Sequence, residues 1–158
     1  SLYRVRNYTQ ISLGRGIKVE NQHFCGTYKH NIDAKNRIFI PAKFRTILGD
    51  SFVVFKSPDG CVSIYTHDEW SEILSQMRGA RTPEDRRRQR MLYAKMQTVE
   101  TDKQGRITLS PDFVEHAHLK KDVEVLGADN RVELWDQDEW DSYMGESDDK
   151  LLSSGIEF

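Results

Sequence analysis

The stretch NIDAKNRIFIPAKFR, residues 31–45, places an Asp and an Arg four positions apart and follows them with a short apolar run and a proline. A later stretch, ETDKQGRITLSPDFV at residues 100–114, repeats this order of features. When the chain is compared with itself, residues 33–44 align with residues 102–113 without a gap. Two copies of this length predict a pseudo-symmetric pair of units, because solenoids need three or more repeats.

The two copies also end alike. DGCVSIYTHDEW at residues 59–70 aligns with DNRVELWDQDEW at residues 129–140, and both finish on Asp-Glu-Trp. Short β-prone runs predict strands in both copies: RIFI and RITL, FVVFK and VEVLG, and CVSIY and RVELW. GTYKHNI, before Asp33, alternates weakly and is a further candidate strand. The sequences SPDG and GADN between the last two runs are typical of hairpin turns. The pattern therefore predicts a mainly β protein.

Capping residues predict short helices beside these strands. A proline at the first helical position, Pro41 or Pro111, opens one helix in each copy, and Ser110 is a candidate N-cap. After the last strand of the first copy, Thr66 begins a helix with one apolar stripe, and Gly79 can end it. The stretch TPEDRRRQRMLYAKM then predicts a helix that joins the copies, with its arginines in solvent.

Composition limits the size and class of the protein. A chain of 158 residues with 37% hydrophobic residues is one compact domain or two half-size units. Halves below about 80 residues have marginal cores, so two such halves are expected to need each other. The 2 cysteines form no CxxC pattern and fit a reducing cytosol. No apolar run suits a membrane helix, and the first residues lack the apolar region of a signal peptide.

The net charge of −2 hides a polarity along the chain. Residues 1–48 contain nine Lys or Arg and two acidic residues, whereas residues 122–158 contain two and twelve. A basic face for an anionic partner explains this polarity. An ordinary solvated surface with an acidic tail explains it equally well.

The two Asp-x-x-x-Arg segments are predicted to be tight turns between strands. Asp33 and Asp102 can accept backbone N–H bonds at the start of each turn, as Asp commonly does. Asn36 and Gly105 occupy equivalent positions, and these residue types best tolerate a positive φ. The arginine leaves the turn beside the carboxylate, so each turn is expected to be closed by an Asp–Arg pair.

The motifs DAKNRIFIPAKFR, DKQGRITLSP and GADNRVELWDQDEW, together with the duplication, resemble the MraZ family of bacterial regulators. The resemblance covers Phe24 to Tyr143. It implies two AbrB-like repeats, of the swapped-hairpin, double-psi type, that form one pseudo-twofold β-barrel with flanking helices. The expected organisation is an N-terminal extension (1–23), a first repeat (24–72), linking helices (73–96), a second repeat (97–143) and an acidic flexible tail (144–158).

The resemblance also implies a function. It predicts a sequence-specific DNA-binding transcriptional regulator, acting as a repressor at repeated boxes upstream of its own cell-division and cell-wall operon. The expected assembly is a ring-like homo-oligomer in the cytoplasm, associated with the nucleoid, with double-stranded DNA as partner. No cofactor, metal, membrane contact or small-molecule substrate is expected.

Basic residues around the two turns are the expected DNA contacts. Arg37 is the candidate for base contact, because a planar guanidinium can bond guanine O6 and N7 together. Lys35, Lys43 and Arg45 are expected to hold phosphates, which sets the register without reading sequence. The full predicted DNA-binding set is Arg37, Lys35, Lys43, Arg45, Lys29, Arg106 and Lys103, with Asp33, Asn36, Asp102 and Gly105 shaping the turns.

Two other classes of function are left open. The same barrel can serve as a non-DNA protein-interaction module through its acidic end, residues 136–149, and DNA binding in a gel shift would exclude this reading. An enzyme is disfavoured, because the chain has no P-loop, no Gly-x-Ser-x-Gly and no convincing Cys–His pair. His116 and His118 would diverge on a helix, and no Cys or acidic residue has metal-ligand spacing with them.

Overall fold

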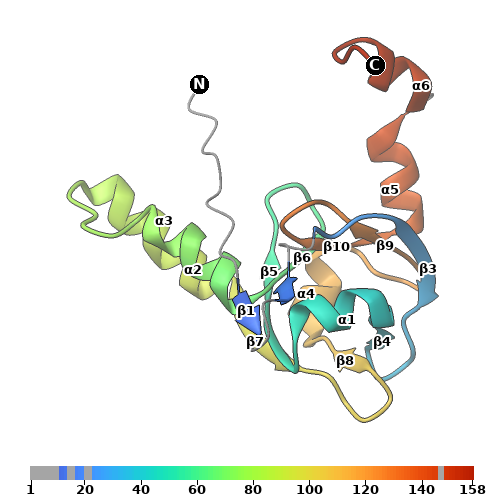
Figure 1. The fold of residues 1–158 in the computed structure, drawn as a ribbon, viewed down its shortest axis with the longest axis horizontal. Helices are drawn as coiled ribbons and strands as arrows, with labels where there is room; N and C mark the ends of the chain where they lie inside the picture. The colour runs from blue at the N-terminus through green and yellow to red at the C-terminus, as the bar shows by residue number, and fades with distance from the viewer. Residues whose placement is uncertain (1–10, 14–16, 20–22, 146–147) are drawn as a thin grey trace.

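The computed structural model describes residues 11–13, 17–19, 23–145 and 148–158 (Figure 1). Most of the predicted N-terminal extension lies outside these residues; within it, β1 (Ile11–Leu13) and β2 (Ile17–Val19) pair antiparallel. The first copy contains β3 (Thr27–Asn31), β4 (Arg37–Phe39), α1 (Ala42–Leu48), β5 (Ser51–Lys56), β6 (Val62–Tyr65) and α2 (His67–Ser75). After the linking α3 (Pro83–Ala94) come β7 (Met96–Glu100), β8 (Arg106–Thr108), α4 (Pro111–His116), β9 (Asp122–Gly127), β10 (Val132–Asp136), α5 (Gln137–Met144) and α6 (Asp148–Ser153).

Six strands form one antiparallel sheet in the order β3-β9-β10-β6-β5-β7. β4 and β8 pair with each other in a separate two-stranded ribbon. The first strand of each copy pairs with the third strand of the other copy, β3 with β9 and β7 with β5. Neither copy can complete its part of the sheet alone, because an edge strand of each part comes from the other copy.

The strand registers show a pseudo-twofold relation between the copies. In the sheet, Ser63 pairs with its own equivalent, Glu133. In the ribbon, Ile38 pairs with its equivalent, Ile107. A residue lies opposite its own counterpart only where a twofold axis passes between two strands. Both pairs therefore mark the axis that relates the copies.

The mainly β class with several flanking helices is confirmed, whereas the expected closed β-barrel is not found. Among the described residues the main sheet ends at β3 and β7, which pair neither with each other nor with the ribbon. β4 and β8 have three residues each and pair with each other. The swapped-hairpin and double-psi details of the expected fold are not confirmed.

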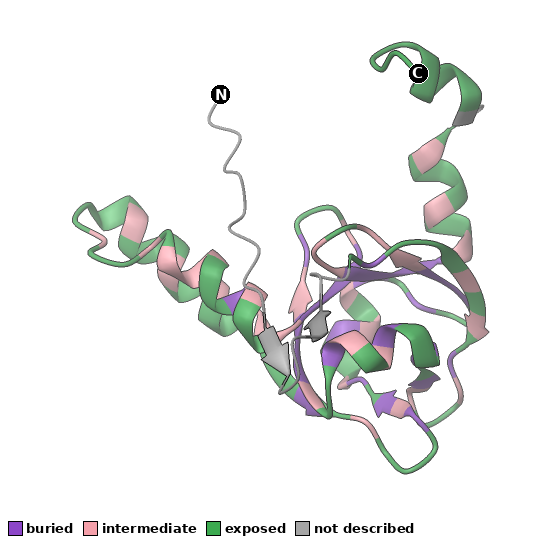
Figure 2. Ribbon diagram, in the orientation of Figure 1, coloured by how far each residue is buried: buried purple, intermediate pink, exposed green. Residues whose placement is uncertain are grey.

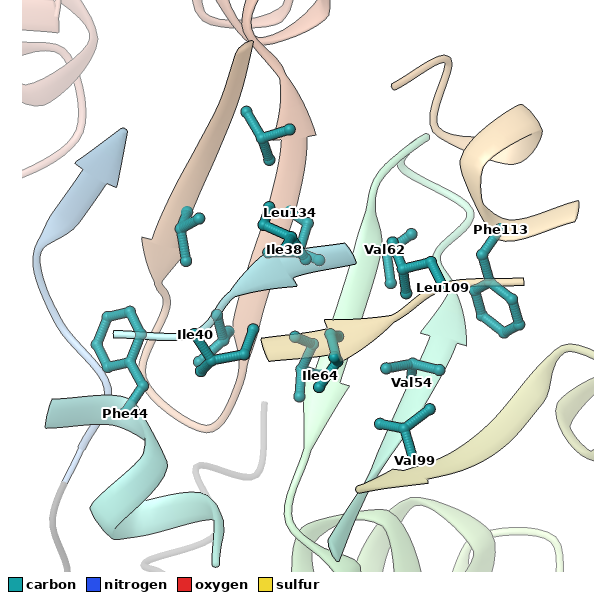
Figure 3. Packing of buried hydrophobic residues seen from close by; sticks show 14 of the residues in the cluster. Ile38, Ile40, Phe44, Val54, Val62, Ile64, Val99, Leu109, Phe113 and Leu134 are labelled. Atoms are coloured by element: carbon teal, nitrogen blue, oxygen red, sulfur yellow. The ribbon is translucent and has the colours of Figure 1, made fainter. Parts of the chain in front are cut away.

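One hydrophobic cluster unites the main sheet, the ribbon and the short helices α1 and α4 (Figure 3). Ile38 and Ile107, at the centre of the ribbon, are fully buried in it. Phe44 of α1 and Phe113 of α4 bring the equivalent aromatic ring of each copy into the same cluster. Because both copies supply this core, burial of apolar area holds them together as one body.

A second cluster lies on the opposite face of the sheet, beneath α2. Val53 belongs to this cluster and its neighbour Val54 to the main core, as strand alternation requires. Trp70, from the predicted apolar stripe, is buried there against Val53 and Tyr65. α2 is begun by Thr66, whose side chain accepts the N–H of the third residue after it at 3.1 Å, as predicted.

The predicted end of α2 at Gly79 is wrong. α2 ends at Ser75, and the next three residues donate to carbonyls three positions back, so the helix tightens into a 3₁₀-type turn. Gly79 lies in that turn with φ of 71°. The glycine therefore supports the reversal of the chain and not the helix end itself.

The two helix-opening prolines also differ from each other. Pro111 is the first residue of α4, as predicted, but Pro41 is the N-cap that precedes α1. At the constant spacing of the copies, Pro41 corresponds to Ser110, which accounts for the shift by one residue. Ser110 is the N-cap of α4, yet its hydroxyl donates to Gln97 Oε1 at 2.7 Å instead of capping the helix.

Two helical arms leave the body on different sides, α2 with α3 and α5 with α6 (Figure 1). α3 is capped by Thr82 and has Pro83 at its first position, as predicted, and no residue of α3 is buried (Figure 2). The segment predicted to be a flexible tail contains the helix α6. Residues 149–158 are all exposed, so this helix is not part of the core.

Candidate nucleic-acid interface

The first Asp-x-x-x-Arg segment forms a turn that its own aspartate organises. Asp33 Oδ1 accepts the backbone N–H of Lys35 at 2.9 Å and that of Arg37 at 2.8 Å. Asp33 Oδ2 accepts Arg37 Nε at 2.7 Å. Asn36 adopts φ of 59°, in the left-handed region. One carboxylate thus holds both the backbone of the turn and the guanidinium that leaves it.

The second turn repeats this arrangement. Asp102 Oδ1 accepts the N–H groups of Gln104 and Arg106, each at 2.9 Å, and its Oδ2 accepts Arg106 Nε at 2.8 Å. Gly105, at the position of the left-handed residue, has φ of 83°. The two turns share only their Asp and Arg in sequence, so these two residues account for the common geometry.

Both carboxylates have a pKa below the ordinary value. The backbone N–H of Arg37 is the main cause that lowers the pKa of Asp33, and that of Arg106 does the same for the pKa of Asp102. Partial burial opposes this shift, and the bonds from the two guanidinium groups add to it. The charged carboxylate is therefore the form that each turn stabilises.

The side of the ribbon that faces away from the core carries both arginines. Strand alternation puts the neighbours of the two buried isoleucines on this side. We call these four residues the ribbon face: Arg37, Phe39, Arg106 and Thr108. Arg37 lies opposite Thr108, and Phe39 lies opposite Arg106. The arginines are diagonal neighbours, which in an antiparallel pair places their Cα atoms roughly 7–8 Å apart.

The two arginines of the ribbon face differ in their freedom. The Arg106 guanidinium lies 5.7 Å from the centre of the Phe39 ring, and its side chain is 19% exposed. Arg37 has the small Thr108 opposite it, and its side chain is 32% exposed. Within the part of the chain that the structure describes, the Nη nitrogens of Arg37 form no hydrogen bond. Arg37 is thus the arginine more available to a partner.

Arg45, predicted to hold a phosphate, is engaged within the protein. Its Nε donates to the carbonyl of Ile40 at 2.9 Å. Its guanidinium lies against Gly105 of the other copy, so closely that a Cβ there would be 2.6 Å from Arg45 Cζ. A side chain at residue 105 would therefore have to displace the Arg45 guanidinium, whereas the equivalent turn accommodates Asn36. Arg45 links α1 of the first copy to the turn of the second.

The predicted lysines fall into two groups. Lys35 and Lys103 are exposed in the two turns, which lie at opposite ends of the ribbon because each turn precedes its strand and the strands are antiparallel. Lys43 and Lys29 lie outside the ribbon, on α1 and β3, and both are exposed. Lys43 Nζ is 3.5 Å from Cys25 Sγ.

The predicted set did not include the aromatic residue of the ribbon face. Phe39 is 44% exposed, between the buried Ile38 and Ile40. The ring of His30 on β3 lies beside it, with centroids 6.4 Å apart. The alternation within RIFI is the signal that identifies Phe39, because two inward isoleucines direct the residue between them outward.

Other site chemistry is limited in the described residues. Burial raises the pKa of the Cys61 thiol to about 12, so this cysteine is a poor nucleophile at neutral pH. No group of three or more His, Cys, Asp or Glu side chains suited to a metal ion is found in the described part of the chain. Over the same residues, none of the helices has the length and apolar character needed to cross a bilayer.

Known proteins resemble this chain over most of its length. The family model for MraZ protein matches twice, at residues 23–91 and 92–154. The transcriptional regulator MraZ of Acetivibrio thermocellus is 42% identical over 125 residues, covering 78% of this chain and 87% of the relative. The protein of the same name from Ligilactobacillus salivarius is 41% identical over 140 residues, covering 85% and 98%. That of Natranaerobius thermophilus is 39% identical, covering 79% and 89%. These matches and the duplicated turns agree: the chain belongs to the MraZ family.

Proposed function

We propose that this protein is a transcriptional regulator that binds double-stranded DNA sequence-specifically through the ribbon face and its two flanking turns. The observation that carries the proposal is the pair of arginines on one solvent-facing ribbon, each oriented by an aspartate. The relatives' name, transcriptional regulator MraZ, supports the same conclusion. The enzyme reading has no comparable support.

The ribbon has a suitable shape for this role. The major groove of B-DNA is about 12 Å wide and admits a two-stranded β-ribbon. Arg37 is held through Nε by Asp33, which leaves its two terminal nitrogens for guanine O6 and N7. Because the turn already orients the guanidinium, less rotamer freedom is lost on binding than for a free arginine. Arg37 is the proposed base contact, and Arg106, packed on Phe39, supports the same face.

Phosphate contacts are proposed for the lysines around the ribbon. Lys35 and Lys103, exposed at its two ends, would meet the DNA backbone on either side of the groove. Lys43 and Lys29 would extend this contact from α1 and β3. Arg45 has a different proposed role: it braces Gly105 and so keeps the second turn in place.

Several copies acting together would supply affinity that one ribbon lacks. We infer a ring-like homo-oligomer in the bacterial cytoplasm, associated with the nucleoid, whose copies engage repeated boxes. Each further contact is then intramolecular, so avidity rises without any new interaction. Repression of the protein's own cell-division and cell-wall operon would follow from occupancy of boxes upstream of it.

Selection from random duplex DNA, followed by binding curves on the recovered sequence, tests the proposal. Arg37→Ala should lose about 1–3 kcal/mol of preference for the selected sequence, the usual value of a bidentate arginine–guanine contact. Arg90→Ala is the matched control, because Arg90 is an exposed arginine of α3, remote from the ribbon. Recovery of no sequence, or equal loss in both variants, would contradict the proposal and favour a protein partner at the acidic end.

A further inference from the structure

A groove lies between α2, α3 and β5. Its volume is about 510 Å³. Its apolar lining comes from three elements, β5, α2 with the turn after it, and α3: Phe55, Ile73, Met77, Met91 and Leu92. Its charged lining consists of three basic residues, Arg87, Arg88 and Lys95, and one acidic residue, Glu84. Met91 is 51% exposed, so part of the apolar lining meets solvent. We call this site the arm groove.

The arm that forms the groove is strongly basic. Between Arg78 and Lys95 there are seven Lys or Arg and two acidic residues. Both acidic residues, Glu84 and Asp85, pair with Arg88 on their own helix. Arg87 has no ion pair among the residues that the structure describes. An acidic, apolar segment would complement this surface.

The other arm of the same chain has these properties. Residues 136–158 contain eight acidic residues and one lysine. Leu151, Leu152 and Ile156 are 58%, 49% and 56% exposed. A helix of six residues such as α6 is marginal in water by itself, because nucleation is costly and so short a helix gains few bonds. Its exposed leucines are therefore available to a partner surface, and packing there would stabilise the helix.

We propose that the C-terminal segment, residues 148–158, of one copy docks in the arm groove of a second copy. Leu151, Leu152 and Ile156 would meet the apolar lining, and Asp149 and Glu157 would meet the arginines of α3. The segment does not lie in its own groove, because the two arms leave the body on different sides (Figure 1). The contact joins unlike surfaces, so it propagates head to tail and closes into a ring where the rotation allows.

This inference rests on the assembly proposed above and names its interface. It does not depend on DNA. Two variants of the full chain separate the two surfaces. The groove variant, Met91→Asp, puts a negative charge into the apolar lining. The tail variant, Leu151→Asp with Leu152→Asp, replaces the apolar side chains of the docking segment with charged ones. All three side chains are about half exposed or more, so neither variant is expected to disturb the fold.

The molecular mass by light scattering and native mass spectrometry is the measurement. The unmodified chain should form a higher oligomer, and each variant alone should be a monomer. An equal mixture of the two variants should give a dimer and nothing larger, because one intact groove meets one intact tail and no further contact can form. Tyr93→Asp on α3 is the matched control for the groove variant, and Ser153→Asp with Ser154→Asp, at and just after the end of α6, is the control for the tail variant. These positions are exposed and are neither lining residues of the groove nor the docked leucines, so both controls should assemble normally.

Any of three results would overturn the inference: a monomeric unmodified chain, a variant that assembles fully, or a mixture that stays monomeric. Arg37→Ala should assemble like the unmodified chain. If no sequence-specific DNA binding is found but the chain and its variants assemble as expected, only the proposed function is contradicted. If DNA is bound as proposed but any of the three overturning results is obtained, only the interface is contradicted.

Discussion

At the residue scale, Asp33 and Asp102 form equivalent hydrogen bonds through the same carboxylate atoms. Each carboxylate accepts two backbone N–H groups and one arginine Nε. Backbone donors bind the charged form of a carboxylate more strongly than the neutral form, and so the pKa of each aspartate is lowered. The stability of the two turns consequently depends on pH through these two carboxylates.

The lowered pKa values predict a specific loss of stability in acid. In the unfolded chain an aspartate titrates near pKa 3.9. The folded pKa lies below that value, so the stabilisation is present above about pH 4 and is lost as the pH falls through the folded pKa. The double variant Asp33→Asn with Asp102→Asn should have a lower melting temperature at neutral pH and a flatter decline below pH 4. Thermal melts across this pH range measure the effect. If the two carboxylates do not stabilise the fold, the decline in melting temperature below pH 4 will be the same in the double variant and the unmodified chain.

Gly105 provides a second test at this scale. Gly105→Ala should destabilise more than Gly60→Ala by about 1 kcal/mol, the value of one side-chain hydrogen bond. Both glycines have positive φ, 83° and 93°, but only a Cβ at Gly105 displaces Arg45, because nothing lies within 4 Å of one at Gly60. Urea unfolding of the two variants measures the difference. In an Arg45→Ala background the two alanine variants should become equal, and a persistent difference would refute the Arg45 contact.

At the scale of the elements, caps and alternation explain most boundaries. Thr66, Thr82 and Asp136 each accept backbone N–H groups at the start of a helix, where these donors have no partner within the helix. The caps at Thr66 and Thr82 should differ in their effect on the free energy of unfolding, because α2 carries the buried Trp70 whereas α3 buries no residue. A cap matters to global stability only where its helix belongs to the cooperative core.

This difference makes a prediction about two matched threonines. Thr66→Ala should lower the free energy of unfolding by about 1 kcal/mol. Thr82→Ala should leave it nearly unchanged and instead increase hydrogen exchange in the first turn of α3. Urea unfolding and exchange mass spectrometry on the two variants test this. Equal global losses would show that α3 folds with the core.

At the scale of the whole molecule, two copies share one core, one sheet and one ribbon, and the arms extend outside it. Removal of residues 144–158 should therefore give the same unfolding midpoint in urea as the monomeric tail variant, because residues 149–158 are exposed and both chains lack the stabilisation that assembly supplies. The same truncation should abolish higher assembly if the arm groove binds this segment. A truncated chain with a clearly lower midpoint would show that the segment stabilises its own copy.

The affinity for DNA should depend steeply on salt concentration, because several ribbons of one assembly would contact phosphates together. Each phosphate contact contributes roughly 0.9 to the slope of log affinity against log salt, so an assembly with several ribbons should give a slope of several units. Lys35→Ala should weaken binding to all sequences and flatten the slope, whereas Arg37→Ala should mainly erase sequence preference. Titrations at several salt concentrations separate the two roles. A binding constant indifferent to salt would exclude the phosphate contacts.

The local features of this protein follow from the sequence alone. The duplicated turns, the positive φ at Asn36 and Gly105, the hairpins and the threonine caps depend on residues within a few positions of each other. Their physical causes, side-chain hydrogen bonds and steric limits on φ, act at that range. The duplication also identified the family, and the partition into residues 24–72, 73–96 and 97–143 stays a prediction.

Tertiary structure alone decided how these local pieces combine. Strand alternation in each copy is the same whether the sheet closes or stays open, so the sequence could not exclude the barrel. In the structure, β3 pairs with β9 and β7 pairs with β5, and these two outer strands leave the sheet open. The contact of Arg45 with Gly105 and the groove between β5, α2 and α3 join residues far apart in the chain. Such contacts depend on which apolar faces can be buried together, a property of the whole folded chain that no short stretch contains.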